Sequence, residues 1–156
     1  MIGFYQGTTL MSRMIRWRTW SDYSHVSWIT EGGSVLEAWR NGVNEWPTVH
    51  HNHKPGTKVT LLGLDYSHER IERIESFLRD QLGKRYDRWG VFGFLARSDR
   101  LQNPNDWFCS ELIFAAHLYA GIALLARVPA HKVFPGLIYI SPILRERGGI
   151  VTEPPG

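Results

Sequence analysis

Short apolar runs in the first part of the chain predict strands of a small antiparallel sheet. IGFYQG predicts a first strand, and TKVTLLGL predicts another. HVSWIT and SVLEAW predict the two strands of a hairpin, because the turn-forming stretch EGGS at 31–34 separates them. Since helical patterns lie between and after these runs, the chain is expected to form an α+β domain with its sheet packed against helices.

The segment 67–83 has the clearest helical period. Ser67 is a suitable N-cap and Gly83 a suitable stop. The apolar positions that recur at helical spacing are Ile71, Ile74, Leu78 and Leu82. A second helix is expected over 108–119, closed by Gly121.

An N-terminal helix is predicted over TTLMSRMIRW, capped by Thr8 or Thr9. It places Leu10, Met14 and Trp17 on one face, which we expect to pack on the core. The arginines of RMIRWR then form a solvated face. Contact of these arginines with an anionic membrane or polymer is the alternative interpretation.

The rest of the chain gives weaker signals. The segment 84–106 is expected to mix loop and short helix, and its charges at Arg97, Asp99 and Arg100 are either solvated or placed to meet a substrate carboxylate. Prolines break the tail HKVFPGLIYISPIL, which predicts loop with one edge strand.

Composition narrows the class of protein. A chain of 156 residues suits one domain over 1–156, and a net charge of 18 − 15 = +3 is too small to predict nucleic-acid binding. No apolar run is long enough to span a membrane, and the first residues do not resemble a signal peptide. We therefore expect no stable membrane insertion and a cytoplasmic, phage-borne or otherwise delivered protein.

Cys109 is the only cysteine in the chain, so an intramolecular disulfide is excluded. It falls in the first turn of the helix predicted over 108–119, where unpaired amides and the helix dipole are expected to lower its pKa. That is a favourable position for a nucleophile. A buried, inert core thiol is the alternative interpretation.

A thiol nucleophile needs a base, and His25 opens a predicted hairpin strand. Glu37 lies among apolar residues on the partner strand, which is an unusual place for a carboxylate without a partner. The hairpin can bring Glu37 close to His25, where it would fix the imidazole tautomer. A solvated strand end and an outward-facing carboxylate are the alternatives.

Two parts of the sequence resemble a known family. GKRYDRWG followed by DWFCSELI resembles the G-x-P-Y-x-x-G and D-C-S-G-L stretches of the NlpC-type, papain-like cysteine peptidases of bacterial cell walls. HVSWITEGGSVLEAWRNGV is similar to their histidine hairpin. Here the hairpin precedes the cysteine, an order that resembles the circularly permuted branch of YiiX/YaeF-like amidases, which has lecithin:retinol acyltransferase relatives.

The resemblance extends over about Ile2 to Ser141 and implies a circularly permuted papain-like domain with a small antiparallel sheet or half-barrel. The roles that it implies are nucleophile for Cys109, base for His25, third polar residue for Glu37, and cleft or oxyanion contacts for Tyr86 and Ser110. It further implies cleavage of amide bonds through a thioester, with peptidoglycan stem peptides as the substrate class and no cofactor.

Two other functions use the same fold. An acyltransferase or lipid esterase would share the thiol chemistry, and a non-catalytic binding module would retain only the shape. The histidines of HHNHK at 50–54 also suggest a metal site. We expect none there, because adjacent side chains of an extended segment point to opposite faces and no cysteine lies nearby.

Overall fold

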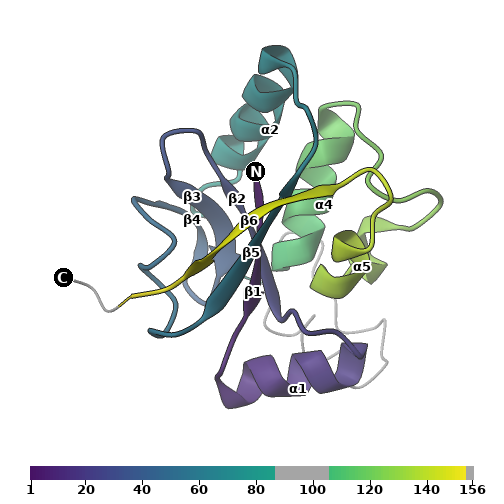
Figure 1. The fold of residues 1–156 in the computed structure, drawn as a ribbon. Helices are drawn as coiled ribbons and strands as arrows, with labels where there is room; N and C mark the ends of the chain where they lie inside the picture. The colour runs from purple at the N-terminus through teal and green to yellow at the C-terminus, as the bar shows by residue number, and fades with distance from the viewer. Residues whose placement is uncertain (87–105, 154–156) are drawn as a thin grey trace.

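The computed structural model describes residues 1–86 and 106–153. All of the described strands belong to one sheet, and the helices lie around it (Figure 1). The elements in chain order are β1 (Ile2–Gln6), α1 (Leu10–Thr19), β2 (His25–Ile29), β3 (Val35–Trp39), β4 (Gly42–Trp46), β5 (Lys58–Gly63), α2 (His68–Asp80), α4 (Cys109–Tyr119), the 3₁₀ helix η2 (Ala130–Lys132), α5 (Pro135–Tyr139) and β6 (Arg145–Val151).

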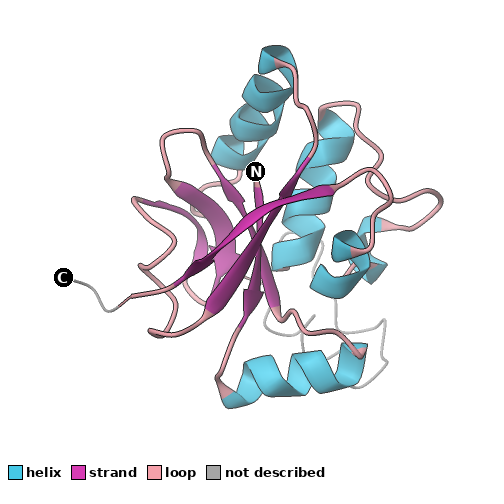
Figure 2. Cartoon of the chain, viewed as in Figure 1, coloured by secondary structure: helices cyan, strands magenta, loops and turns pink. Residues whose placement is uncertain are grey.

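The six strands form an antiparallel sheet in the order β4-β3-β2-β1-β5-β6. Strand β1 lies inside the sheet and pairs with both β2 and β5, so that Tyr5 is opposite His25 on one side and Val59 on the other. The α+β class and the small antiparallel sheet are therefore confirmed. The sheet is open, with β4 and β6 at its edges (Figure 2).

Alternate side chains of β1, β2, β3 and β5 enter two separate cores. The larger core contains Val26 and Leu36 from the sheet, together with Ile74 of α2 and Cys109 and Leu112 of α4. The smaller core lies on the opposite face of the sheet. It comprises Tyr5, Ile29, Val35, Val49, Val59 and Leu61.

Helix α2 follows its predicted pattern up to its last turn. Ser67 caps it through a hydrogen bond from the Arg70 amide, and Ile74 and Leu78 are buried. The helix ends at Asp80, so Leu82 lies in the following turn and is exposed, contrary to the prediction. Helix α4 begins at Cys109 and ends at Tyr119, close to the predicted bounds.

The structure corrects the prediction for the N-terminal helix. Thr9 caps α1, and its side chain accepts a hydrogen bond from the Ser12 amide. Leu10, Met14 and Trp17 are exposed, whereas Ser12 and Ile15 face the protein. The apolar face that we expected in the core is thus directed to solvent, because the helix turns the face with Ser12 and Ile15 toward the protein.

Two strands and one helix were not predicted. β4 follows a tight turn at Arg40-Asn41, because Trp39 at the end of β3 pairs with Gly42 at the start of β4, and Gly42 has a φ of +104°. β6 begins beyond the tail segment that was expected to hold an edge strand, and that segment instead contains α5. Pro135 occupies the first turn of α5, where its missing N–H costs no hydrogen bond, so it starts a helix instead of breaking one.

Candidate active site

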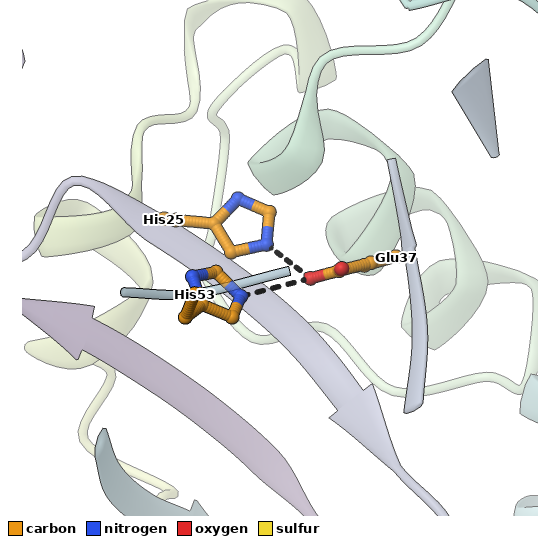
Figure 3. A group of neighbouring side chains, drawn as sticks. All are labelled: His25, Glu37 and His53. Atoms are coloured by element: carbon orange, nitrogen blue, oxygen red, sulfur yellow. Dashed lines mark hydrogen bonds and ion pairs between the residues drawn. The ribbon is translucent and has the colours of Figure 1, made fainter. Parts of the chain in front are cut away.

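Glu37 is a fully buried carboxylate with three hydrogen-bond donors around it. His25 Nε2 is 2.6 Å from Oε2, His53 Nε2 is 3.4 Å from the same oxygen, and Asn52 Nδ2 donates to Oε1 at 2.9 Å. Both histidine rings point at the carboxylate (Figure 3). Burial alone raises the pKa of Glu37, but the electrostatic attraction and hydrogen bond of the His25 ring, followed by those of His53, hold that pKa well below its usual range. Glu37 is therefore ionised.

An ionised carboxylate only accepts hydrogen bonds, so His25 Nε2 carries a hydrogen and donates it to Glu37. Burial lowers the pKa of His25, and the opposing effect of Glu37 does not restore it. The ring is then neutral and its Nδ1 has a free lone pair. Nδ1 lies on the side of the ring away from Glu37 (Figure 3), which leaves it available as a base.

Aromatic rings enclose the His25–Glu37 pair on the smaller-core face. Trp39 meets the His25 ring edge-on with centroids 4.5 Å apart, and Tyr5 lies 5.1 Å from it. Tyr5 also stacks on His53 at 4.0 Å, while its hydroxyl is hydrogen-bonded to Ser27. These contacts keep water from the pair and fix both imidazoles in place.

Cys109 is the first residue of α4 and is buried. Burial raises the pKa of its thiol to about 12. The backbone of Val26 and of Ser110 lowers that pKa only in part, and the charge of Glu37 raises it further. The expected low pKa is therefore wrong for this resting state, because the loss of hydration outweighs the favourable helix terminus.

Cys109 approaches the His25 strand from the larger-core side. Within the described residues its thiol lies against the backbone of Val26, the next residue after His25, and is not hydrogen-bonded to the imidazole. The ring of His25 packs on the other side, against Tyr5. The thiol and the imidazole therefore both lie next to the start of β2.

Tyr86 and Ser110 occupy different surroundings. Tyr86 forms an isolated parallel bridge with Trp107, and it lines the same cavity as His25. The buried hydroxyl of Ser110 donates to the Val133 carbonyl at 2.6 Å, so this side chain is engaged in packing. Ser110 contacts the thiol of Cys109 through its backbone and not through its hydroxyl.

Two cavities adjoin His25. The smaller, of about 140 Å³, reaches His53 and Lys54. The larger, of about 450 Å³, has Met11 and Ile15 of α1 on one side and Tyr86 on another. His25, Trp39 and Arg40 belong to both cavities, so a bound molecule in either would lie next to the imidazole.

The side chains of the histidine-rich stretch at 50–54 make different contacts. His51 stacks on Trp46 at 4.1 Å, and His50 Nδ1 accepts a hydrogen bond from the Glu153 amide. Asn52 and His53 turn inward to Glu37. Sequence reasoning assigned neither of these two residues to the site, because the loop that carries them is irregular and no period indicates which side chains face inward.

His25, Glu37 and His53 place one ligand-type atom each within 4.8 Å of one another. Two imidazoles and one carboxylate form a donor set that suits several divalent transition metals. The cluster combines one residue of the HHNHK stretch with two of the hairpin, an arrangement that the sequence did not predict. Arg97, Asp99 and Arg100 lie outside the described residues.

Comparisons with known proteins bear on the fold. A scan against family models finds no match, and a search of curated proteins finds none. Among solved structures, the metalloprotein yiiX from Escherichia coli O157:H7 matches with a TM-score of 0.67 and 18% sequence identity, over 98% of this chain and 96% of that one. The chain therefore shares the fold of a YiiX protein.

Proposed function

We propose that this protein is a cysteine hydrolase that cleaves amide bonds through a thioester, with Cys109 as nucleophile and His25 as base. The feature that most supports this role is the buried, ionised Glu37, which holds the Nε2–H of a neutral His25 and directs Nδ1 away from itself. The YiiX-like fold and the position of Cys109 next to the His25 strand add support.

The resting site holds a neutral thiol and a neutral imidazole, so proton transfer must accompany attack. His25 Nδ1 takes the Cys109 proton while sulfur bonds to the carbonyl carbon, and first-turn amides of α4 stabilise the oxyanion. The C–N bond breaks as the imidazolium protonates the leaving amine. Water then attacks the thioester, gives a proton to His25, and releases the acid and the Cys109 thiol. In the resting site the imidazole packs on Tyr5, and the thiol lies on the other side of the start of β2. This mechanism therefore requires a rearrangement on substrate binding that brings His25 Nδ1 and the Cys109 thiol into hydrogen-bond contact.

The substrate class follows from the resemblance to cell-wall amidases, so peptidoglycan stem peptides are the first substrates to test. Mass spectrometry would follow release of the amine and acid products. We expect Cys109→Ser and His25→Ala to lose detectable turnover, whereas His51→Ala retains it, because His51 stacks on Trp46 away from Glu37. Turnover that survives in Cys109→Ser would overturn the proposal. Transfer of the acyl group to an added amine or lipid, without free acid, would identify the acyltransferase alternative.

Glu37→Gln tests the orienting carboxylate. We expect turnover to fall by roughly a hundredfold or more, because an amide at this position can reverse the required tautomer. Glu45→Gln is the matched control, since Glu45 is on the neighbouring strand and its carboxylate contacts Arg79 and Ser34. Equal turnover in the two variants would remove Glu37 from the mechanism.

Metal binding is the second candidate function. It is favoured by the His25–Glu37–His53 cluster and by the description of the structurally similar yiiX as a metalloprotein. It ranks second because a proton already joins His25 to Glu37 at 2.6 Å, and a metal ion would have to displace it. Titration calorimetry with Zn²⁺ would compare wild type with His53→Ala and with His51→Ala. If the hydrolase assignment is correct, a chelator leaves turnover unchanged; a loss restored by zinc would favour the metal.

A further inference from the structure

Helix α1 directs large apolar side chains into solvent. Leu10 is 74% exposed, Met14 43% and Trp17 76%, and at about 100° per residue these three fall within an arc of roughly 60°. Trp20, which follows the helix in a left-handed conformation with a φ of 52°, is 93% exposed. Helix α1 lies across one end of the sheet (Figure 1). The exposed side chains make its outer face an apolar stripe.

The charges that α1 itself carries beside this stripe are all positive. Arg13 and Arg18 flank it on opposite sides, and α1 contains no acidic residue. Arg16 lies nearer the protein and donates to the Gly7 carbonyl. An apolar stripe with one arginine on each side is complementary to an anionic surface with an apolar interior.

A lipid bilayer has this chemistry. Indole rings favour the boundary between headgroups and acyl chains, and arginines beside them pair with anionic headgroups. Nucleic acid or another polyanion would account for the arginines but not for Leu10, Met14 and Trp17. A helix of this length lies in the interface plane. In the part of the chain that the structure describes, no helix is long and apolar enough to cross a bilayer.

We propose that the outer face of α1 docks on the surface of a bilayer that contains anionic lipid. Leu10, Met14 and Trp17 enter the headgroup region, and Arg13 and Arg18 contact the lipid phosphates. The inner side of the same helix carries Met11 and Ile15, which line the larger cavity beside His25. Docking therefore places that cavity next to the membrane surface.

Sedimentation with lipid vesicles tests the docking with the full chain. Vesicles of phosphatidylcholine alone are compared with vesicles that also contain phosphatidylglycerol. The apolar variant is Leu10→Ser with Trp17→Ser, and its control is Leu118→Ser with Tyr119→Ser, two exposed positions on α4. The charge variant is Arg13→Gln with Arg18→Gln, and its control is Arg70→Gln with Arg73→Gln on α2. Circular dichroism and thermal unfolding establish that each variant is folded.

We expect wild type to sediment with the anionic vesicles, and each α1 variant to bind at least about tenfold more weakly, because two groups that enter or contact the bilayer are removed. The control variants should bind like wild type. No preference for anionic vesicles, or equal loss in the control variants, would overturn the proposal. If the protein binds heparin as tightly as it binds anionic vesicles, and the Leu10→Ser, Trp17→Ser variant binds heparin like wild type, the arginines would instead form a polyanion site. The hydrolase proposal does not depend on this result, since turnover on a dissolved peptide is measured separately.

Discussion

At the scale of single residues, the site is organised by one carboxylate. Glu37 is buried and accepts hydrogen bonds from His25, Asn52 and His53, so among the described residues these donors balance its negative charge. Breaking such a buried network leaves a costly unpaired charge. His25 is the proposed base and Glu37 the residue proposed to orient it. Together with Asn52 and His53, which hold Glu37, they therefore form one cooperative unit.

The resting thiol gives a direct prediction. Because the pKa of Cys109 is raised to about 12 by burial, alkylation by iodoacetamide should be slow at neutral pH and should keep accelerating well above the free-thiol pKa of about 8.5. The rate is measured against pH on native protein, where the lone cysteine makes the label specific. A plateau near neutral pH would show a preformed thiolate and contradict the neutral pair.

His53 is a positioning residue in this unit, and His53→Phe tests it. The aromatic ring preserves stacking on Tyr5 but removes the hydrogen bond to Glu37, so turnover should fall by roughly tenfold. The electrostatic effect of His53 lowers the pKa of His25, so removal of His53 should move the acid limb of kcat/KM to higher pH. His51→Phe is the control. An unchanged acid limb with an unchanged rate would contradict the role of His53.

At the scale of elements, the tight turn before β4 depends on one glycine. Gly42 combines a φ of +104° with a close backbone neighbour, since a Cβ there would lie 2.5 Å from the Lys84 carbonyl oxygen. That carbonyl accepts the Val43 amide, and the Gly83 amide donates to the Val43 carbonyl. The turn after α2 is thereby attached to β4.

Gly42→Ala should therefore lower the free energy of unfolding by roughly 3 kcal/mol, from backbone strain and overpacking together. Gly56→Ala is the matched control, because its φ of +83° brings the strain while no atom lies within 4 Å of the added Cβ. Gly56→Ala should lower the free energy of unfolding by about 1 to 2 kcal/mol. Urea unfolding measures both, and equal losses would show that the contact with Lys84 relaxes freely.

The elements also show how much of the fold can be predicted from the sequence. The 25–39 hairpin, the approach of Glu37 to His25 and the helix that starts at Cys109 follow from local patterns and turn residues. The outward face of α1 does not, because amphipathic spacing shows that a helix has an apolar side but not which side the sheet covers. β6 was missed because its residues are mostly exposed and polar, so its pairing with β5 supplies the order that no hydrophobic period predicts.

At the scale of the whole molecule, acid should destabilise the fold through His117. This buried side chain donates from Nδ1 to the Ile113 carbonyl, and its Nε2 accepts a hydrogen bond from the Tyr66 hydroxyl. Burial lowers its pKa from 6.5 to about 4. Between these two values the unfolded chain binds a proton that the folded chain does not, so stability falls as the pH falls through this window.

The expected loss is about 3 kcal/mol between neutral pH and a pH of about 4, from 6.5 − 4 = 2.5 units of pKa. His117→Gln should remove that part of the pH dependence, whereas His68→Gln should retain it, because His68 is exposed on α2. Urea unfolding at several pH values measures the difference. The same pH dependence in His117→Gln and wild type would assign acid sensitivity to other groups.

The order of segments along the chain has a consequence for synthesis. Strands β1 to β5 and the loop with Asn52 and His53 all precede residue 64, whereas Cys109 follows much later. A chain emerging from the ribosome therefore presents the strands of the imidazole cluster before any thiol exists. Because β1 pairs with both β2 and β5, these strands can associate while the remainder is still being translated. The nascent protein thus carries the proposed base without the proposed nucleophile until α4 packs against the sheet.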